Sequence, residues 1–365
     1  MKILVTGSSG FIGKNLCLFL RQSGQEVLPF DRDTEAPLES LVNECDFVMH
    51  LAGVNRPMNP EEFYDGNANL TYRLISLLEQ QKHQIPVLLS SSIQAAKDND
   101  YGKSKKMAED MVFEYGRKTG SPVFIYRLDN AFGKWCRPNY NSVVATFCYN
   151  IAHGLEIKIN DAEAAVPFVY IDDICSSFIV CLHQPGSPEI LSVQPSYTVT
   201  IGRLAEMLLS FRDSRETHFL PELKDGFEKK LYSTYLSYLP ENSFSYLLQS
   251  HIDQRGSFTE FVKTPDRGQV SINISHPGVV KGKHWHHSKN EKFLVVSGTG
   301  IIRFRKIGEK KIIEYPVSGA KMEVVDIPTG YTHSIENTGD TDMITVMWAN
   351  ESFDPNHPDT FAEEV

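Results

Sequence analysis

The sequence lacks an apolar run long enough to cross a membrane, and it lacks any cluster of lysine and arginine. A membrane-spanning helix needs about 20 mainly apolar residues, whereas the apolar run near the start, KILV, has only four. The net charge is −10, which disfavours binding to nucleic acids or anionic membranes. We therefore expect no membrane insertion, no secretion signal, no nucleic-acid partner and a cytoplasmic location.

The sequence also lacks a cysteine framework. Its six cysteines form no CxxC pair, and none lies after residue 181. This spacing is not that of a disulfide-rich secreted domain, so we expect reduced and buried thiols.

The chain length and the pattern of apolar residues both indicate two domains. The 365 residues exceed one typical core. Up to about residue 245, short apolar runs alternate with amphipathic helices, which is the rhythm of a doubly wound parallel sheet. Beyond it, β-rich runs such as QVSINIS and KFLVVSG alternate with turn residues, which is typical of an antiparallel barrel or sandwich. We predict a Rossmann-type α/β domain over residues 1–245 and an all-β domain over residues 246–365.

Three glycines, Gly7, Gly10 and Gly13, lie between the first predicted strand and the first predicted helix. Glycines let the backbone turn tightly and approach a pyrophosphate, which the free N–H groups of the helix start then bind. The acid that this fold places on the cofactor ribose is Asp31, which favours NAD. Arg32 follows directly and suits the 2′-phosphate of NADP, so these residues alone leave the cofactor open.

Tyr101 and Lys105 begin a predicted helix and lie on one helical face. A lysine ammonium there is expected to lower the pKa of the tyrosine, so that the phenol exchanges a proton with a substrate oxygen near neutral pH. Ser90, Ser91 and Ser92 end a nearby strand, where a hydroxyl could bind the same oxygen. The alternatives are a solvent-facing Tyr/Lys pair and serines that only satisfy backbone groups.

These motifs occur in order with HLAG (residues 50–53), RLDNAFG and FVYIDDI. Together they resemble the extended short-chain dehydrogenase/reductases that act on nucleotide sugars. The resemblance implies that Tyr101 is the catalytic acid/base, that Lys105 binds the ribose and tunes Tyr101, and that Ser92 binds the substrate oxygen. Ser92 lies only nine residues before Tyr101, so Ser91 and Gln94 stay open as alternatives. The implied cofactor site comprises Gly7, Gly10, Phe11, Ile12, Gly13, Asp31, Arg32, Leu51, Ala52, Gly53, Tyr101 and Lys105.

The stretch HWHHSKNE carries His284, His286 and Glu291, and His333 follows farther along. Three imidazoles and a carboxylate suit a divalent metal; the alternative is a solvated histidine-rich loop. The residues fit G-x5-H-x-H-x4-E-x6-G and P-x-G-x2-H-x3-N, which resemble the two motifs of a cupin barrel. The resemblance implies that these four residues bind one divalent metal, with zinc favoured over iron, manganese or nickel.

The whole chain resembles the bifunctional capsular polysaccharide biosynthesis enzymes of the UDP-N-acetyl-L-fucosamine pathway, in which an extended reductase precedes a cupin. The resemblance implies a UDP-linked 4-keto-6-deoxy amino sugar as substrate. The barrel would epimerise it at carbon 3, and the first domain would reduce the 4-keto group with NADPH rather than NADH. The implied product is UDP-2-acetamido-2,6-dideoxy-L-talose, and the implied assembly is a homodimer.

Several roles stay open at this point. The candidate cations for the substrate diphosphate are Lys134, Arg137, Lys281 and Lys283. The candidates for the epimerisation base are His287, Tyr331 and a metal-bound water. Three rival functions also remain: a barrel that only holds a structural metal and dimerises, a barrel that is an iron dioxygenase, and a first domain that is an epimerase or dehydratase with tightly held NAD.

Overall fold

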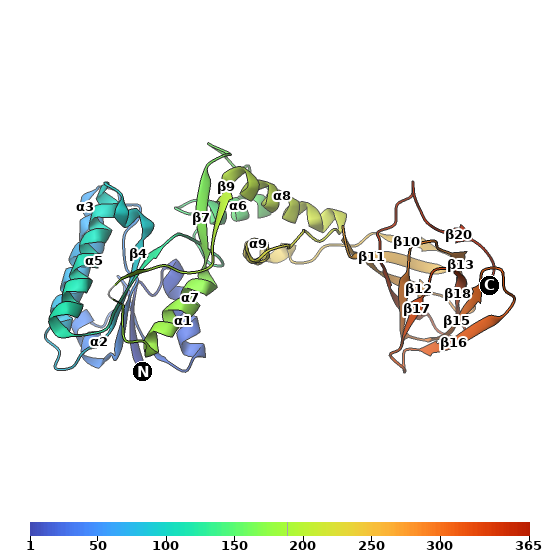
Figure 1. Cartoon of the computed structure of the whole chain (residues 1–365), viewed down its shortest axis with the longest axis horizontal. Coiled ribbons are helices and arrows are strands. Elements are labelled where there is room, and N and C mark those ends of the chain that lie inside the picture. Colours follow the sequence, from blue (N-terminus) through green and yellow to red (C-terminus); the bar gives the residue numbers. More distant parts are fainter. Residues whose placement is uncertain (188) are drawn as a thin grey trace. The chain divides into compact units, whose positions relative to one another are not determined.

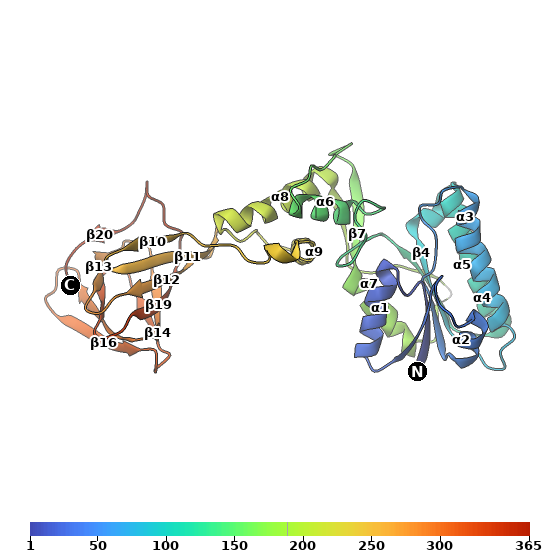
Figure 2. The ribbon, with the colours of Figure 1, turned by 180° about the vertical axis from the view of Figure 1, so that it is seen from behind.

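The structure, a computed structural model, describes residues 1–187 and 189–365. The chain divides into two compact units, Met1–Leu209 with Asp225–Pro240 and Ser210–Lys224 with Glu241–Val365. Figures 1 and 2 show both units from opposite sides. Within the described ranges, no helix combines the length and the apolar character needed to cross a lipid bilayer.

The first unit is built on a six-stranded parallel sheet with the strand order β2-β1-β3-β4-β5-β8. Its strands are β1 (Lys2–Thr6), β2 (Glu26–Phe30), β3 (Phe47–His50), β4 (Val87–Ser92), β5 (Val123–Leu128) and β8 (Ile190–Leu191). The helices that flank it are α1 (Phe11–Gln22), α2 (Leu38–Glu44), α4 (Leu70–Leu78), α5 (Asp100–Thr119) and α7 (Ile171–Val180). Pro29 is tolerated in β2 because β2 is the edge strand of this sheet.

Both faces of this sheet are buried, and β1 shows why its sequence is continuously apolar. Successive side chains of a strand point to opposite faces. Ile3 and Val5 pack into the core cluster that contains α1 and α7 residues, whereas Leu4 packs into the cluster that contains residues of α2, α4 and α5. Figure 1 shows α1 and α7 on one side of the sheet and α5 on the other. A strand covered by helices on both sides needs apolar residues at every position.

Smaller elements complete the helical part of the chain. A three-stranded sheet has the order β6-β7-β9. Its strands are β6 (Asn130–Phe132), β7 (Ala165–Tyr170) and β9 (Ser196–Thr200), and the remaining helices are α3 (Glu61–Phe63), α6 (Val143–Ala152), α8 (Ile201–Thr217) and α9 (Gly226–Leu236).

The second unit is a barrel-like pair of antiparallel sheets with the orders β10-β11-β12-β19-β14-β17 and β16-β15-β18-β13-β20. Alternate residues of β15, such as Ile302 and Phe304, enter its core, while Arg303 between them pairs with Glu314 and Glu336 outside. The strands are β10 (Ser250–Asp253), β11 (Gly256–Thr264), β12 (Gly268–Ser275), β13 (Val280–Trp285), β14 (Glu291–Ser297), β15 (Thr299–Lys306), β16 (Ile312–Ser318), β17 (Val324–Ile327), β18 (Tyr331–Asn337), β19 (Met343–Ala349) and β20 (Phe361–Ala362).

The predicted fold class, a doubly wound parallel sheet followed by an all-β barrel, is confirmed by these pairings. The small β6-β7-β9 sheet was not predicted from the sequence. Neither was β20, because a two-residue strand leaves no periodic pattern to detect.

A buried chain of hydrogen bonds joins the carboxyl ends of β1 and β3 to α4. The hydroxyl of Thr71 donates to the Asn67 carbonyl at 2.6 Å, so its oxygen accepts from His50 Nε2 at 2.9 Å. The Thr6 hydroxyl then donates to His50 Nδ1 at 2.6 Å, and its own oxygen accepts two backbone N–H groups of the following loop. His50 is therefore neutral, with its proton on Nε2.

Stability should depend on pH through His50. Burial lowers the pKa of His50 to about 3, and the nearby Lys105 charge acts in the same direction. The unfolded chain takes up this proton near pH 6.5, so the folded state loses stability as the pH falls from about 6.5 towards 3, by up to about 1.4 kcal/mol per pH unit. We expect the ¹⁵N spectrum of His50 to show a neutral Nε2-protonated ring at pH 5, where exposed imidazoles are charged. A charged ring at pH 5 would contradict this assignment.

Candidate functional site

A cavity of about 790 Å³ opens at the carboxyl edge of the parallel sheet, where ligands bind in doubly wound folds. Asp31, Arg32 and Ala52 are not among the described residues that line it. The predicted residues that do line it are Gly7, Gly10, Phe11, Ile12, Gly13, Leu51, Gly53, Ser92, Tyr101 and Lys105.

The glycine loop is closely packed and could not accept larger residues at two positions. Gly7 has φ +70°, and a Cβ there would lie 2.8 Å from the Ala52 Cα atom. A Cβ on Gly13 would lie 2.1 Å from the Gly7 carbonyl oxygen. Ala52 therefore belongs to the wall behind the loop, and the loop backbone faces the cavity directly.

Asp31 is hydrogen-bonded to the glycine loop. Its carboxylate accepts the Ser9 backbone N–H at 3.0 Å, the Ser9 hydroxyl and the Arg32 backbone N–H at 2.9 Å. Partial burial acts to raise the pKa of Asp31, but the bonds from Ser9 and Arg32 outweigh it and lower the pKa. The Arg32 side chain is exposed at the same end of the sheet.

Tyr101, Lys105 and Ser92 all line the cavity, and Tyr101 contacts Ser92. Lys105 is buried and its Nζ donates to the Ser90 carbonyl at 2.8 Å; burial lowers its pKa to about 8, against the opposing charge of Glu109. Burial raises the pKa of Tyr101, and a hydrogen bond with Ser92 offsets part of that rise. The expectation that Lys105 lowers this pKa was therefore wrong for the site as it stands, because loss of solvent around the phenol dominates.

The hydroxyl of the neighbouring Ser91 is already hydrogen-bonded to a buried carboxylate. The Ser91 hydroxyl donates to Glu109 Oε1 at 2.6 Å, and Glu109, fully buried, pairs with Arg127 through two bonds of 2.9 and 2.7 Å. The Ser92 oxygen, by contrast, accepts the Gln94 N–H at 3.2 Å and contacts Tyr101. Gln94 also lines the cavity.

Asn67 was missed by sequence reasoning although it supports the same helix. Its side chain bonds both the N–H and the carbonyl of Val54 at 3.0 Å and donates to Ser104 at 2.9 Å. Ser104 in turn donates to the Tyr101 carbonyl at 2.8 Å. No local pattern in the sequence marks Asn67, because its partners Val54 and Ser104 lie 13 and 37 positions away.

In the second unit, the structure brings together all four predicted metal ligands. His284 and His333 are register partners on β13 and β18, and Glu291 begins β14. One ligand atom from each of His284, His286, Glu291 and His333 lies within 4.8 Å of the others. Four side chains that are far apart in the sequence thus converge on one point.

The polar atoms of this cluster lack other partners, which is the arrangement that a metal ion fits. Among the described residues, His286 Nε2, Glu291 Oε2 and both ring nitrogens of His333 are buried without a hydrogen bond. The two histidines lie 3.6 and 3.4 Å from the Glu291 oxygen, at ion-pair separations. Buried polar atoms without partners are rare, and imidazole nitrogens with a carboxylate oxygen suit zinc and similar divalent ions.

Burial and the contacts within the cluster shift the pKa values of three of its members. Burial lowers the pKa of His284 to about 4, with help from His333 and His286. Burial acts to lower the pKa of His286 too, but bonds with Glu291 and the Asp359 backbone outweigh it and raise the pKa. Burial opposes ionisation of Glu291, but interactions with His286 and His333 outweigh it and lower its pKa. A metal ion would compete with the proton of His286, because neutral imidazole and ionised carboxylate are the forms that bind metal ions.

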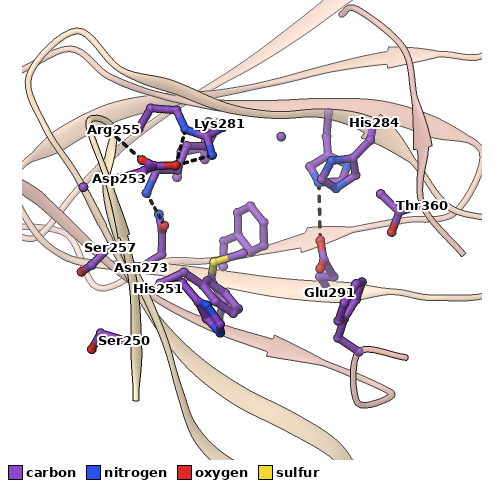
Figure 3. A pocket seen from close by; sticks show the side chains of 18 of the residues that line it. Ser250, His251, Asp253, Arg255, Ser257, Asn273, Lys281, His284, Glu291 and Thr360 are labelled. Carbon is purple, nitrogen blue, oxygen red and sulfur yellow. Dashed lines mark hydrogen bonds and ion pairs between the residues drawn. The ribbon is translucent and has the colours of Figure 1, made fainter. Parts of the chain in front are cut away.

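A cavity of about 660 Å³ lies beside this cluster (Figure 3). His284 and Glu291 form one side of it, while Arg255, Lys281 and Asp253 form the opposite side. Lys281 donates to Asn273 Oδ1 and to a backbone carbonyl, each at 2.8 Å, and Asp253 pairs with Arg255 at 2.6 Å. The wall facing the cluster therefore carries two cations and one carboxylate.

Some candidates from the sequence lie away from the cavities. Neither His287 nor Tyr331 is among the described residues that line the barrel cavity. The His287 ring packs against Trp285, with centroids 4.5 Å apart, and Tyr331 packs against the barrel core. His251 of β10 lines the cavity and was missed.

The candidate cations also separate into two groups. Lys134 pairs with Asp172 at 2.6 Å and Lys283 with Glu364 at 3.1 Å. Arg137 lines the first cavity, and Lys281 lines the second.

Comparison with known proteins agrees with this two-part architecture. Residues 3–193 match the NAD dependent epimerase/dehydratase family, and residues 251–361 match the polysaccharide biosynthesis C-terminal domain. The chain is 48% identical to UDP-2-acetamido-2,6-beta-L-arabino-hexul-4-ose reductase of Pseudomonas aeruginosa over 100% of this chain and 99% of that protein.

Solved structures are similar over the same extent. Capsular polysaccharide assembling protein CapF from Staphylococcus aureus has a TM-score of 0.95 and 52% identity, with 100% of each chain covered. A structure of CapF with the inhibitor 3-isopropenyl-tropolone has a TM-score of 0.90 and 48% identity, again with 100% of each chain covered. The chain therefore belongs to the NAD dependent epimerase/dehydratase family and is related to CapF over its whole length.

Proposed function

We propose that the chain is a bifunctional nucleotide-sugar enzyme. The barrel epimerises UDP-2-acetamido-2,6-dideoxy-4-hexulose at carbon 3, and the first unit reduces the 4-keto group with NADPH to UDP-2-acetamido-2,6-dideoxy-L-talose. The observation that carries the proposal is the presence of two separate cavities, one with Tyr101 beside a glycine loop and one with a His/Glu cluster. The P. aeruginosa relative, named as a reductase of a UDP-linked 4-ketose, supports the choice of substrate.

Reduction adds a hydride to carbon 4 and a proton to the resulting alkoxide. NADPH supplies the hydride when bound. The raised pKa of Tyr101 keeps its phenol protonated at neutral pH, so it can give that proton to the alkoxide. The Ser92 hydroxyl, already bonded to Tyr101, would donate to the same oxygen, and the Lys105 ammonium in the lining of the same cavity favours negative charge there.

The preference for NADPH is supported by the surroundings of Asp31. Its carboxylate is already engaged by Ser9 and Arg32 backbone groups. The exposed guanidinium of Arg32 next to it suits a 2′-phosphate, since arginine binds phosphate through several donors at once.

A Tyr101→Phe variant should lose reduction while keeping the cofactor. Removing the proton donor is expected to lower kcat by about 100- to 10,000-fold, while NADPH binding followed by fluorescence stays near that of the unmodified protein. Tyr64→Phe is the matched control, because Tyr64 is a half-buried tyrosine that bonds Asp100 at the head of the same helix. Equal loss in both variants, or no loss in Tyr101→Phe, would count against this role.

Epimerisation removes the proton at carbon 3, which the adjacent 4-keto group acidifies, and returns a proton to the opposite face. We infer that His284, His286, Glu291 and His333 hold a divalent metal, zinc by ligand type. Such an ion supplies Lewis-acid stabilisation of negative charge on an oxygen when bound. Arg255 and Lys281 lie opposite the cluster, together with the Asp253 carboxylate. One carboxylate does not neutralise both cations, so these two side chains would bind the diphosphate of the substrate.

The barrel should exchange the carbon-3 hydrogen without any cofactor. Proton NMR of the enzyme with the UDP-4-keto sugar in heavy water, without NADPH, is expected to show deuterium entering at carbon 3. His284→Ala or His333→Ala should abolish the exchange, whereas His287→Ala should keep it, because its ring packs on Trp285 outside the cavity. Reduction without any exchange would favour the rival function, a reductase whose barrel holds a structural metal.

The same exchange experiment tests the proposed diphosphate contact. Lys281→Met should raise the substrate concentration at half-maximal exchange by about tenfold or more, since a charge-assisted hydrogen bond contributes about 1.5–3 kcal/mol. Lys283→Met should have little effect, because Lys283 is exposed and pairs with Glu364. Equal effects of the two substitutions would remove Lys281 from the substrate site.

We propose a homodimer that associates through the edge strand β10. Within the described chain, β10 pairs with β11 alone, and an unpaired edge with apolar side chains is a pairing surface. Ile252 on β10 is 78% exposed and Leu247 just before it is 96% exposed. Ile252→Asp should yield a monomer in sedimentation velocity, whereas the unmodified chain sediments as a dimer; dimers in both cases would rule out this edge.

A further inference from the structure

The carboxyl-terminal residues 358–364, here called the C-terminal strap, lie along the strands that carry the His/Glu cluster. β20 pairs with β13 through His284↔Ala362 and Trp285↔Phe361. The Glu363 N–H donates to the Lys283 carbonyl at 3.0 Å. The strap is thus hydrogen-bonded to the strand that carries the first histidine of the cluster.

The other side of the strap is anchored to the neighbouring strands. The Thr332 hydroxyl of β18 donates to the Glu363 carbonyl at 2.6 Å, one residue before His333. Arg305 of β15 pairs with the Glu363 carboxylate at 2.7 Å. The strap is therefore bonded to three strands of the barrel, β13, β18 and β15.

Asp359 within the strap accepts several hydrogen bonds from the loop after β13. Its carboxylate accepts three successive backbone N–H groups, those of His287 at 2.9 Å, Ser288 at 2.9 Å and Lys289 at 2.8 Å. It also accepts the Ser288 hydroxyl at 3.0 Å. Its own carbonyl accepts from His286 Nδ1 at 2.6 Å.

These contacts have two consequences for His286. The bond from Nδ1 to a carbonyl requires a proton on Nδ1, so Nε2 is the nitrogen that faces Glu291 and would bind a metal ion. The three N–H bonds hold the loop between His286 and Glu291 at a fixed position. Asp359 has φ +36°, a conformation that costs energy for a residue other than glycine and persists when surrounding contacts enforce it.

We propose that Asp359 is a positioning residue of the His/Glu cluster, which sets the ring tautomer of His286 through its carbonyl and the shape of the 287–289 loop through its carboxylate. This inference rests on the proposed metal binding by the cluster. It does not depend on whether the barrel epimerises a sugar, because it concerns the presentation of a ligand atom.

Zinc affinity provides the first test. The full chain, stripped of metal, is titrated with Zn²⁺ against a competing chelator, and Asp359→Asn is expected to weaken zinc binding by about 10- to 100-fold, the usual effect of a group that orients a ligand. Asp354→Asn is the matched control, because Asp354 accepts the Asn356 N–H at 2.8 Å in the same terminal segment. Ser288→Ala removes one of the bonds to Asp359 and should have a smaller effect.

The amide signals of the loop provide a readout that a general loss of stability would not single out. In ¹H–¹⁵N spectra of the full chain, Asp359→Asn should shift the amide signals of His287, Ser288 and Lys289, because their N–H groups bond the Asp359 carboxylate, and leave those of the barrel strands unchanged. The variant keeps the Asp359 carbonyl, so the bond from His286 Nδ1 should persist. Unchanged affinity in Asp359→Asn would overturn the inference, and so would weaker binding with unchanged signals for these three amides. Failure of the unmodified chain to bind zinc would overturn the metal site itself and this inference with it.

Discussion

A hydrogen bond from a side-chain nitrogen to a main-chain carbonyl orients a functional group in each unit. Lys105 Nζ donates to the Ser90 carbonyl at 2.8 Å, and His286 Nδ1 donates to the Asp359 carbonyl at 2.6 Å. Both side chains are buried, where a polar nitrogen without a partner would cost about 1–3 kcal/mol. In each case the carbonyl satisfies one donor. The other N–H groups of Lys105 and the Nε2 atom of His286 are then the groups left for the site.

The two proposed reactions have different requirements, which suits two sites. Hydride delivery needs a nicotinamide beside a proton donor, and the first unit combines a glycine loop with a protonated Tyr101 in one cavity. The proposed inversion at carbon 3 would consume no cofactor and would need stabilisation of an enolate, for which a metal ion held by three imidazoles and one carboxylate is suited. Burial contributes to both sites, because it raises the pKa of Tyr101 and lowers that of His284.

The sequence predicted residues whose positions in the cavities depend on local spacing. The glycine loop, the Tyr101–Lys105 pair and the alternation of His284 with His286 are all readable within a few positions. The placement of His287 was not readable in this way, because it lies beyond the end of β13, where its ring packs against Trp285 at 4.5 Å. The pKa of Tyr101 was predicted in the wrong direction, because burial of the phenol cannot be read from the spacing of a charge.

Contacts between distant segments were beyond the sequence. Asp359 lies 73 positions from His286, and the β20 pairing that brings it there involves only two residues. Ser91 is hydrogen-bonded to Glu109, which lies 18 positions away in the sequence. The reason to favour Ser92 over Ser91 as the proposed substrate-binding serine therefore depends on the packing of α5 against β4. Such partners depend on tertiary placement and leave no periodic signal.

The central claim is that one chain performs two reactions in sequence at two sites. The direct test is an ordered transfer: the UDP-4-keto sugar is incubated with Tyr101→Phe protein without NADPH, the protein is removed by filtration, and the filtrate is given to His333→Ala protein with NADPH. The account predicts that UDP-2-acetamido-2,6-dideoxy-L-talose forms from this filtrate and that untreated substrate does not yield it with His333→Ala protein. No product from the filtrate, or equal product from untreated substrate, would contradict the account.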